Sequence, residues 1–241
     1  MLTQKSDFIF ILITLLLVLS FLPFPFLDHY HTVIFNPKYW YISSFIKFGI
    51  LATLGESLGL RISKGMYNYN GFGLIPRAIV WGTLGIMIKI VFVVFAIGSP
   101  TMLEKLFGIT NAVDSMKANS IFDALELGLG GTRIITAFAI SSLMNLIFAP
   151  VFMTLHKITD THIIDNNGTL KGFFSPIKYY KIFPELNWSV QWNFVFKKTI
   201  PFFWIPAHTI TFLMPAEYRI IFAAILGVVL GLILSLSANR S

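Results

Sequence analysis

The chain has 241 residues, of which 56% are hydrophobic and 12% charged, and its mean hydropathy is +0.76. Because a soluble domain usually carries about 25% charged residues, this composition excludes an ordinary water-soluble fold and predicts a membrane protein. The net charge of +7 comes mainly from lysines and arginines beside apolar runs, where they set orientation in the membrane, so nucleic acid is not an expected partner. Cysteine is absent, which excludes disulfides and cysteine ligands.

The apolar residues are gathered into runs of sixteen or more. They lack the two-residue alternation of barrel strands, so the runs predict spanning helices. The first run covers residues 8–27. No small-x-small cleavage site follows it, which favours a retained helix over a signal peptide, and residues 1–39 are predicted to form an extra N-terminal helix and loop. Runs at about 40–60 and 75–98 flank the polar turn MYNYNGFG and predict a helical hairpin.

Two inserts are predicted between the later helices. Pro100 is expected to end the third helix, and residues 99–132 then mix charged and apolar side chains; within them SIFDALELGL predicts a short amphipathic helix. The fourth helix is predicted at about 133–155. A second insert, near 156–198, holds six lysines interleaved with aromatic residues, a composition that favours the membrane interface.

About forty residues at the end of the chain predict two more spanning helices, joined by a tight corner at Met214–Glu217 that Arg219 is expected to hold. The second of these helices carries a small residue at every fourth position, so another helix can approach it closely. These helix-packing residues are Ala223, Gly227, Gly231 and Ser235. The predicted fold is all-α: a polytopic transmembrane helical bundle of about six spanning helices, four to five of which form the core within residues 40–241.

Six spans would place both termini on the same side of the membrane. That side holds ten lysines and arginines in this topology, and the other side holds five. Since positively charged loops tend to remain on the inside, both termini are predicted to be inside.

Ionisable side chains inside spanning helices are costly and suggest function. Glu56 and Arg77 lie at similar depth near the inner ends of their helices, which predicts a charge pair at the inner mouth of a pathway; a structural salt bridge is the alternative. Lys89 shares a helical face with small residues, and this face is expected to point into the bundle. Lys89 is therefore a candidate for lining a polar path, with snorkelling as the alternative. Lys47 lies half a turn from Glu56 and is not expected to point inward.

Further polar residues lie near the middle of the fourth and fifth helices: Ser141, Ser142, Asn145 and His208. We predict that they line the same path as Lys89 and make a mildly cationic interior, which would suit an anionic or polar solute. Interhelical hydrogen bonding also explains such residues without transport.

Catalysis is not predicted, because HExxH, G-x-S-x-G and phosphate-loop motifs are absent. A membrane-embedded enzyme, with His208 approaching Glu56, is the third alternative. His29 and His31 supply only two ligands, which is too weak a pattern to predict a metal site. No cofactor is expected. The expected partners are the lipid bilayer and small solutes, with a homo-oligomer left open.

Four patches of the chain carry a family pattern: Leu54–Glu56, Pro76 with Trp81, Asn145–Pro150, and a closing signature of Trp204, Pro206, Phe212, Pro215, Arg219 and Leu234–Ser235. These patches resemble the family of the 22-kDa peroxisomal membrane protein and the mitochondrial inner-membrane protein Mpv-seventeen. Glu56 stands in place of the family's aspartate, and Met144-Asn145 in place of its Asp-Gln. The resemblance covers about residues 40–237, apart from the two inserts.

The resemblance implies four core helices and membership of a family regarded as weakly selective membrane channels that affect small-metabolite homeostasis. Its eukaryotic members occupy peroxisomal or mitochondrial inner membranes. The N-terminus here is not an Arg- and Ser-rich presequence, which leaves a bacterial cytoplasmic membrane equally open. The expected function is a weakly selective pore or gated pathway for small anionic or polar solutes. The alternative is a non-conducting membrane scaffold that binds a partner protein.

Overall fold

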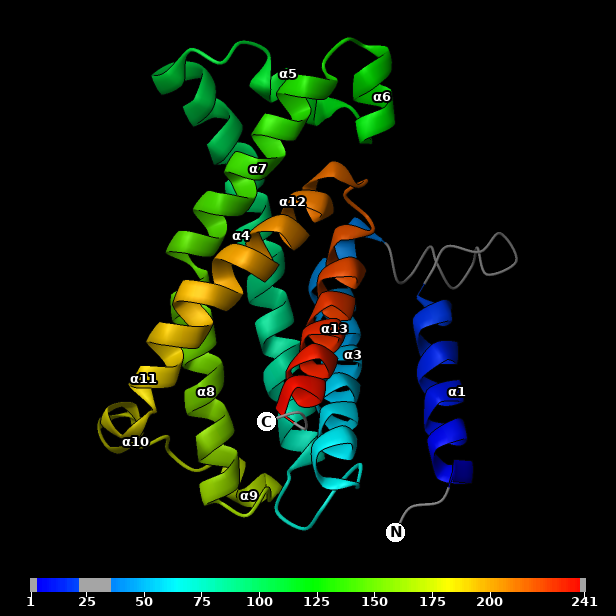
Figure 1. Cartoon of the computed structure of the whole chain (residues 1–241), viewed down its shortest axis with the longest axis vertical. Helices are drawn as coiled ribbons and strands as arrows, with labels where there is room; N and C mark the ends of the chain where they lie inside the picture. Colours follow the sequence, from blue (N-terminus) through cyan, green and yellow to red (C-terminus); the bar gives the residue numbers. More distant parts are fainter. Residues whose placement is uncertain (1–3, 22–35, 239–241) are drawn as a thin grey trace. The chain divides into compact units, whose positions relative to one another are not determined.

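The computed structural model describes residues 4–21 and 36–238, and every regular element within these ranges is helical. The all-α class is therefore confirmed. Among the described residues, two helices are long and apolar enough to cross a membrane, α4 (Leu74–Phe107) and α7 (Gly130–Ile147). The other elements, in chain order (Figure 1), are α1 (Gln4–Ser20), the 3-10 helix η2 (Pro37–Tyr39), α3 (Trp40–Lys64), α5 (Ala112–Lys117), α6 (Ile121–Glu126), α8 (Ala149–Asp165), α9 (Leu170–Phe173), α10 (Tyr179–Glu185), α11 (Trp188–Val190), the π-helix η3 (Gln191–Trp204), α12 (Ile205–Leu213) and α13 (Arg219–Ala238).

The chain divides into two compact units, and each is described by itself. Unit 1 contains the described residues up to Ile86, together with Thr159–Lys178 and the described residues from Ala224 onward. Unit 2 contains Met87–Ile158 and Tyr179–Ala223. Three helices, α4, α8 and α13, each continue from one unit into the other.

In unit 1, α3 and α4 pack closely together at positions where α4 carries glycine. A methyl group added to Gly82 would come 2.6 Å from the ring of Phe45, and one added to Gly85 would overlap Phe48. The small face predicted on α4 therefore lies against α3 at these two positions. Such close approach is the main source of helix association where water supplies no hydrophobic driving force.

α3 has two further neighbours in unit 1. A Cβ added to Gly55 would lie 3.0 Å from the Cα of Val228 on α13, and Arg61 forms an ion pair with Asp7 on α1. Lys47 is only 3% exposed, so the expectation that it would not point inward is wrong. Because helices cover α3 on several sides, Lys47 is buried although it lies half a turn from Glu56.

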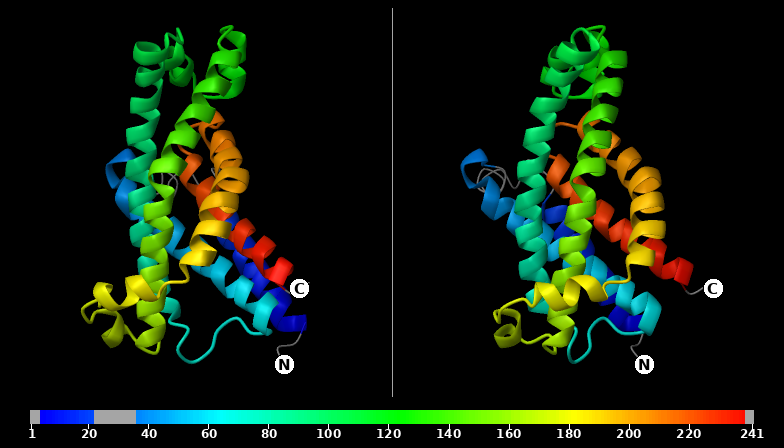
Figure 2. Two further views of the ribbon diagram at one scale, coloured as in Figure 1. Left: turned by 60° about the vertical axis from the view of Figure 1, so that its left-hand side comes forward. Right: turned by 90° about the vertical axis from the view of Figure 1, so that its left-hand side faces the viewer.

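Unit 2 is built around α7, which packs along α12 and contacts α5 and α6. Within this unit, α5 and α6 lie beyond one end of α7, and α10 and α11 lie beyond the other end (Figures 1 and 2). The amphipathic helix predicted in the first insert is present as α6. Its first turn is closed by a capping box in which Ser120 and Asp123 each bond the other's backbone N–H, which satisfies two amide groups that a helix start leaves open.

The prediction that Pro100 ends the third helix is wrong, because α4 continues through it to Phe107. A proline inside a helix removes one backbone hydrogen bond, but an apolar helix tolerates this loss where nearby groups satisfy the backbone. Pro100 itself is fully buried, and Thr101 Oγ1 donates to the carbonyl of Ile97, which follows the carbonyl of Ala96 that loses its donor, over 3.0 Å.

The predicted fourth helix at 133–155 differs from the structure in both its continuity and its length. α7 ends at Ile147 and α8 begins at Ala149, so the helix is interrupted at Phe148. The interruption comes two residues before Pro150, which has no N–H for the helix ladder. Helix then continues to Asp165, into the lysine-rich stretch predicted as an insert.

Candidate functional site

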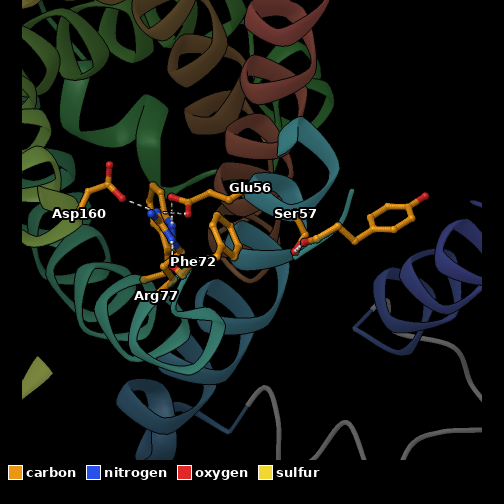
Figure 3. A network of polar contacts seen from close by, with 7 residues as sticks. Glu56, Ser57, Phe72, Arg77 and Asp160 are labelled. Carbon is orange, nitrogen blue, oxygen red and sulfur yellow. Dashed lines mark hydrogen bonds and ion pairs between the residues drawn. The ribbon is translucent and has the colours of Figure 1, made fainter. Parts of the chain in front are cut away.

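The first cluster of buried polar groups lies in unit 1 and is centred on Arg77 (Figure 3). The loop before α4 presents Phe72, whose carbonyl accepts from Arg77 Nε over 2.8 Å. The guanidinium also lies 4.4 Å from the centroid of the Phe72 ring, a distance at which a cation is attracted to an aromatic face. The backbone N–H of Arg77 donates to the carbonyl of Gly73 over 2.9 Å. The loop therefore fixes Arg77 in the first turn of α4.

Two carboxylates meet this arginine. Arg77 Nη1 donates to Glu56 Oε2 over 2.6 Å and forms a second ion pair with Asp160 on α8. The other oxygen of Glu56 accepts from the indole N–H of Trp81 over 2.8 Å. Arg77 is only 7% exposed, and a buried charge pair of this kind is stable only with such additional hydrogen bonds. The network joins α3, α4 and α8, and the pairing of Glu56 with Arg77 expected from their similar depth is present.

Asp160 is held in place by a contact between two glycine-containing turns. Gly168 has a φ of +63°, and a Cβ there would come 2.5 Å from the backbone nitrogen of Gly73. Both positions therefore favour glycine. The sequence did not single out Asp160, because it falls in the predicted second insert. A usable signal was the absence of glycine and proline between Pro150 and Gly168, which favours an uninterrupted helix.

A second ion pair of unit 1 attaches α1 to α3. Two nitrogens of Arg61 donate to the two carboxylate oxygens of Asp7, each over 2.7 Å, and the hydroxyl of Tyr67 donates to Asp7 over 2.8 Å. The hydrogen bond from Arg61 and then that from Tyr67 lower the pKa of Asp7 to about 2. The ring of Phe10 on α1 stacks on Tyr67 with centroids 4.0 Å apart. Nothing in the spacing of these residues predicts the cluster.

In unit 2, the polar residues predicted on the fourth helix connect α7 to α12. The hydroxyl of Ser141 donates to the carbonyl of Ile205 over 2.7 Å, and Asn145 Nδ2 donates to the carbonyl of Ser141 over 2.9 Å. Both residues are buried. Ser142 Oγ is inaccessible and has no hydrogen-bond partner within the described ranges. Interhelical hydrogen bonding therefore accounts for Ser141 in this conformation.

His208 lies within a cluster of aromatic rings. It stacks on Trp204 with centroids 5.2 Å apart, and the ring of Phe92 meets it edge-on at 5.4 Å. Phe212 continues the cluster at 5.0 Å from Phe92, and His208 is 7% exposed. The imidazole of His208 is therefore packed between aromatic rings in this structure.

Two arginines of unit 2 converge on the C-terminal end of α12. Arg133, which is 0% exposed, donates to the carbonyls of Ser115, Ala118 and, at 3.5 Å, Leu213. Arg219 donates from Nε to the carbonyl of Met214 over 3.2 Å and from Nη2 to that of Phe212 over 3.4 Å. Three consecutive carbonyls, those of residues 212–214, therefore accept from two guanidinium groups. Helix ends leave such carbonyls without intrahelical partners, so the arginines also close the corner after α12.

These two arginines and Lys89 have no carboxylate within ion-pair distance among the described residues. The charge of Arg133 acts on Arg219, and that of Arg219 acts on Lys89. Asp123 acts on Arg133 only as a more distant charge. In the sequence, Arg133 was counted only among the five positive residues of the outer side. The structure therefore adds a buried cation to unit 2.

The sequence-predicted residues are divided between the units. The path candidates Lys89, Ser141, Ser142, Asn145 and His208 all belong to unit 2, whereas Glu56 and Arg77 belong to unit 1. Of the predicted packing residues, Ala223 is buried in unit 2. In unit 1, Gly231 would place a Cβ 3.7 Å from the carbonyl of Gly55, and Gly227 has open space around it. Ser235 belongs to α13, but its side chain is outside the described part, as are His29 and His31.

No cluster of three or more potential metal ligands occurs among the residues that the structure describes. Comparisons of the chain with protein-family models, curated proteins and solved structures find no match.

Proposed function

We propose that the chain is an integral membrane protein of about six spanning helices that forms a gated pathway for small anionic solutes. Support for the membrane comes from the apolar helices α4 and α7 and from two shorter apolar stretches, Asp7–Leu17 and Arg219–Gly231. Large apolar side chains such as Ile97 on α4 and Phe138 on α7 are exposed. Such side chains would face lipid, and the count of lysines and arginines favours both termini inside.

The observation that carries the solute class is the set of cations in unit 2. Arg133, Arg219 and Lys89 lie on apolar elements and have no carboxylate partner among the described residues. Backbone carbonyls accept hydrogen bonds from the arginine N–H groups. A carbonyl is a neutral dipole, however, so it does not cancel the net charge of a guanidinium. The interior of this unit therefore keeps a positive field, which attracts anions and repels cations.

We assign this structure to a closed conformation. Rings enclose His208, and Ser141 bonds α12 instead of water. In unit 1, Arg77 holds Glu56 and Asp160 together, and this pairing acts as a lock at the inner end of the helices. Opening would separate such charges, a two-state change of the kind that switches use. The resemblance to the Mpv-seventeen family points to the same channel-like function.

The test is conductance of the purified chain in planar bilayers under a salt gradient. Lys89→Glu should move the reversal potential toward cation preference, because it reverses one charge of the path. The matched control is Lys105→Glu, which makes the same charge change at an exposed position near the end of the same helix. Equal reversal potentials for the wild type and Lys89→Glu would remove Lys89 from the path.

A non-conducting scaffold is the second candidate, and one observation favours it specifically. Glu56 and Arg77 are paired, and the imidazole of His208 packs against aromatic rings, so these three groups already have contacts within the protein in this conformation. A folded chain that shows no conductance under any salt gradient or voltage would establish this alternative over the pathway.

A further inference from the structure

The segment from Tyr179 to Trp204, which comprises α10, α11 and η3, presents large aromatic rings at the surface of unit 2. Tyr180 is 82% exposed, Trp192 57% and Phe183 48%. Soluble surfaces rarely expose several large rings close together in sequence, and tryptophan and tyrosine are enriched where a membrane meets water.

The charges of the same segment are almost all positive. It contains three lysines, Lys181, Lys197 and Lys198, all exposed, against a single carboxylate at Glu185. Lysines close to a membrane attract anionic lipids because of the negative surface potential of those lipids. We call these three lysines, together with Tyr180, Phe183 and Trp192, the aromatic-lysine surface.

The π-helical winding of η3 places a lysine beside one of these rings. In a π-helix the backbone bonds join residues five apart, so Trp192 and Lys197 fall on the same side. In an α-helix they would point about 140° apart. Lys197 Nζ lies 5.6 Å from the centroid of the Trp192 ring, and the ring of Phe196 meets Trp192 edge-on at 6.1 Å. An ammonium group on a ring face keeps N–H donors free for an anion.

The position of the surface within unit 2 agrees with a membrane interface. α10 and α11 lie at the opposite end of the unit from α5 and α6 (Figure 2), so an α7 that crosses the bilayer would leave these two groups of elements near opposite headgroup layers. Six of the ten positive residues counted toward the inside lie in the second insert itself.

We propose that the aromatic-lysine surface binds the headgroups of anionic phospholipids. The lysines would contact the lipid phosphates, and the rings would lie at the level between headgroup and acyl chain. The choice of lipid over a protein partner rests on charge complementarity together with exposed rings at an interfacial position. It requires that the chain be embedded in a membrane, but it does not require that the chain conduct.

The experiment is mass spectrometry of the intact chain in detergent micelles, with phosphatidylglycerol and phosphatidylcholine titrated separately. The wild type should bind phosphatidylglycerol more tightly. Replacing Lys181, Lys197 and Lys198 by Gln should weaken that binding by about fivefold for each lysine removed and leave phosphatidylcholine binding unchanged. Trp192→Ala should weaken the binding of both lipids. The control is Lys105→Gln, which replaces an exposed lysine elsewhere in unit 2 and should change the binding of neither lipid.

Three results would overturn the assignment. Unchanged phosphatidylglycerol binding by the triple variant would remove the lysines from any lipid site. Displacement of the lipid by millimolar inorganic phosphate would assign the surface to a soluble anion. Equal binding of both lipids by the wild type would leave a protein partner as the occupant. Because the binding is measured in micelles, its failure is distinguishable from a failure to conduct.

Discussion

The two units compensate buried positive charge in different ways. In unit 1, Arg77 meets two carboxylates, which more than offset its charge inside the network. In unit 2, Arg133 and Arg219 meet backbone carbonyls, and no described carboxylate lies within ion-pair distance. The first arrangement removes the field of the arginine, and the second satisfies its donors while the field persists. We therefore assign a locking role to the first and an anion-attracting role to the second.

The largest expected effect comes from breaking the network of unit 1. Arg77→Met removes the guanidinium and leaves Glu56 and Asp160 close together without it. Loss of one partner of a buried ion pair typically costs about 3–5 kcal/mol, so thermal unfolding in detergent should shift strongly downward. Glu56→Gln is the milder control, because its amide oxygen can still accept from Trp81. Similar unfolding temperatures for wild type and Arg77→Met would contradict a structural lock.

The next effect should come from the carbonyl-bound arginine of unit 2. Arg133→Met leaves the carbonyls of Ser115 and Ala118 without donors, at about 1–3 kcal/mol for each. Arg133→Lys should restore only part of the stability, because an ammonium lacks the planar fork of a guanidinium. Denaturant unfolding compares the three proteins. Full rescue by lysine would mean that charge, and not the carbonyl geometry, matters at this position.

A smaller effect is expected where helices approach closely. Gly85→Ala forces a methyl group against Phe48, and overpacking typically costs about 1–3 kcal/mol. Gly227→Ala is the matched control, because a Cβ at Gly227 meets nothing within 4 Å. The measured quantity is the unfolding midpoint of each variant. A larger loss of stability for Gly227→Ala would show that the small-residue face predicted on α13 is more closely packed than the contact between α3 and α4.

The smallest effect concerns the attachment of α1. The pKa of Asp7 is lowered from 3.8 to about 2 by Arg61 and Tyr67, so this contact stabilises the folded state above about pH 4. That contribution is lost as the pH falls through about 2. Hydrogen exchange of the α1 amides should be slower in the wild type than in Asp7→Asn at pH 5, and the ratio of the two rates should shrink as the pH is lowered to 2. A ratio that stays the same between pH 5 and pH 2 would exclude the carboxylate as its cause.

The helical class and the Glu56–Arg77 pairing could be predicted from sequence, because apolar run length and depth along a helix depend on local spacing. The corner at Met214–Glu217 and the helix around Asp123 could be predicted for the same reason, since turn and cap residues act locally. The continuation through Pro100 could not, because neighbouring groups decide whether a proline ends a helix.

The contacts between distant segments were largely beyond sequence reasoning. Asp160 meets Arg77 across a long stretch of sequence, in a unit where the turns at Gly73 and Gly168 also touch. Arg133 is buried where it bonds carbonyls at the end of α12 and in α5. A helical wheel shows which face a side chain occupies, but it does not show how many neighbours cover the helix, and this is why Lys47 was misplaced.

The most direct test is the accessibility of the centre of unit 2 to charged reagents. The chain has no cysteine, so Lys89→Cys would carry the only thiol. We expect that thiol to react faster with a sulfonate-bearing reagent than with a trimethylammonium-bearing one, because the positive charge of Arg219 acts at this position. Val94→Cys is the control, because this exposed apolar position lies about 140° around the same helix from Lys89, and its thiol should react with neither reagent. Equal rates with the two reagents, or no reaction at Lys89→Cys under conditions in which the chain conducts, would contradict a water-accessible cationic path.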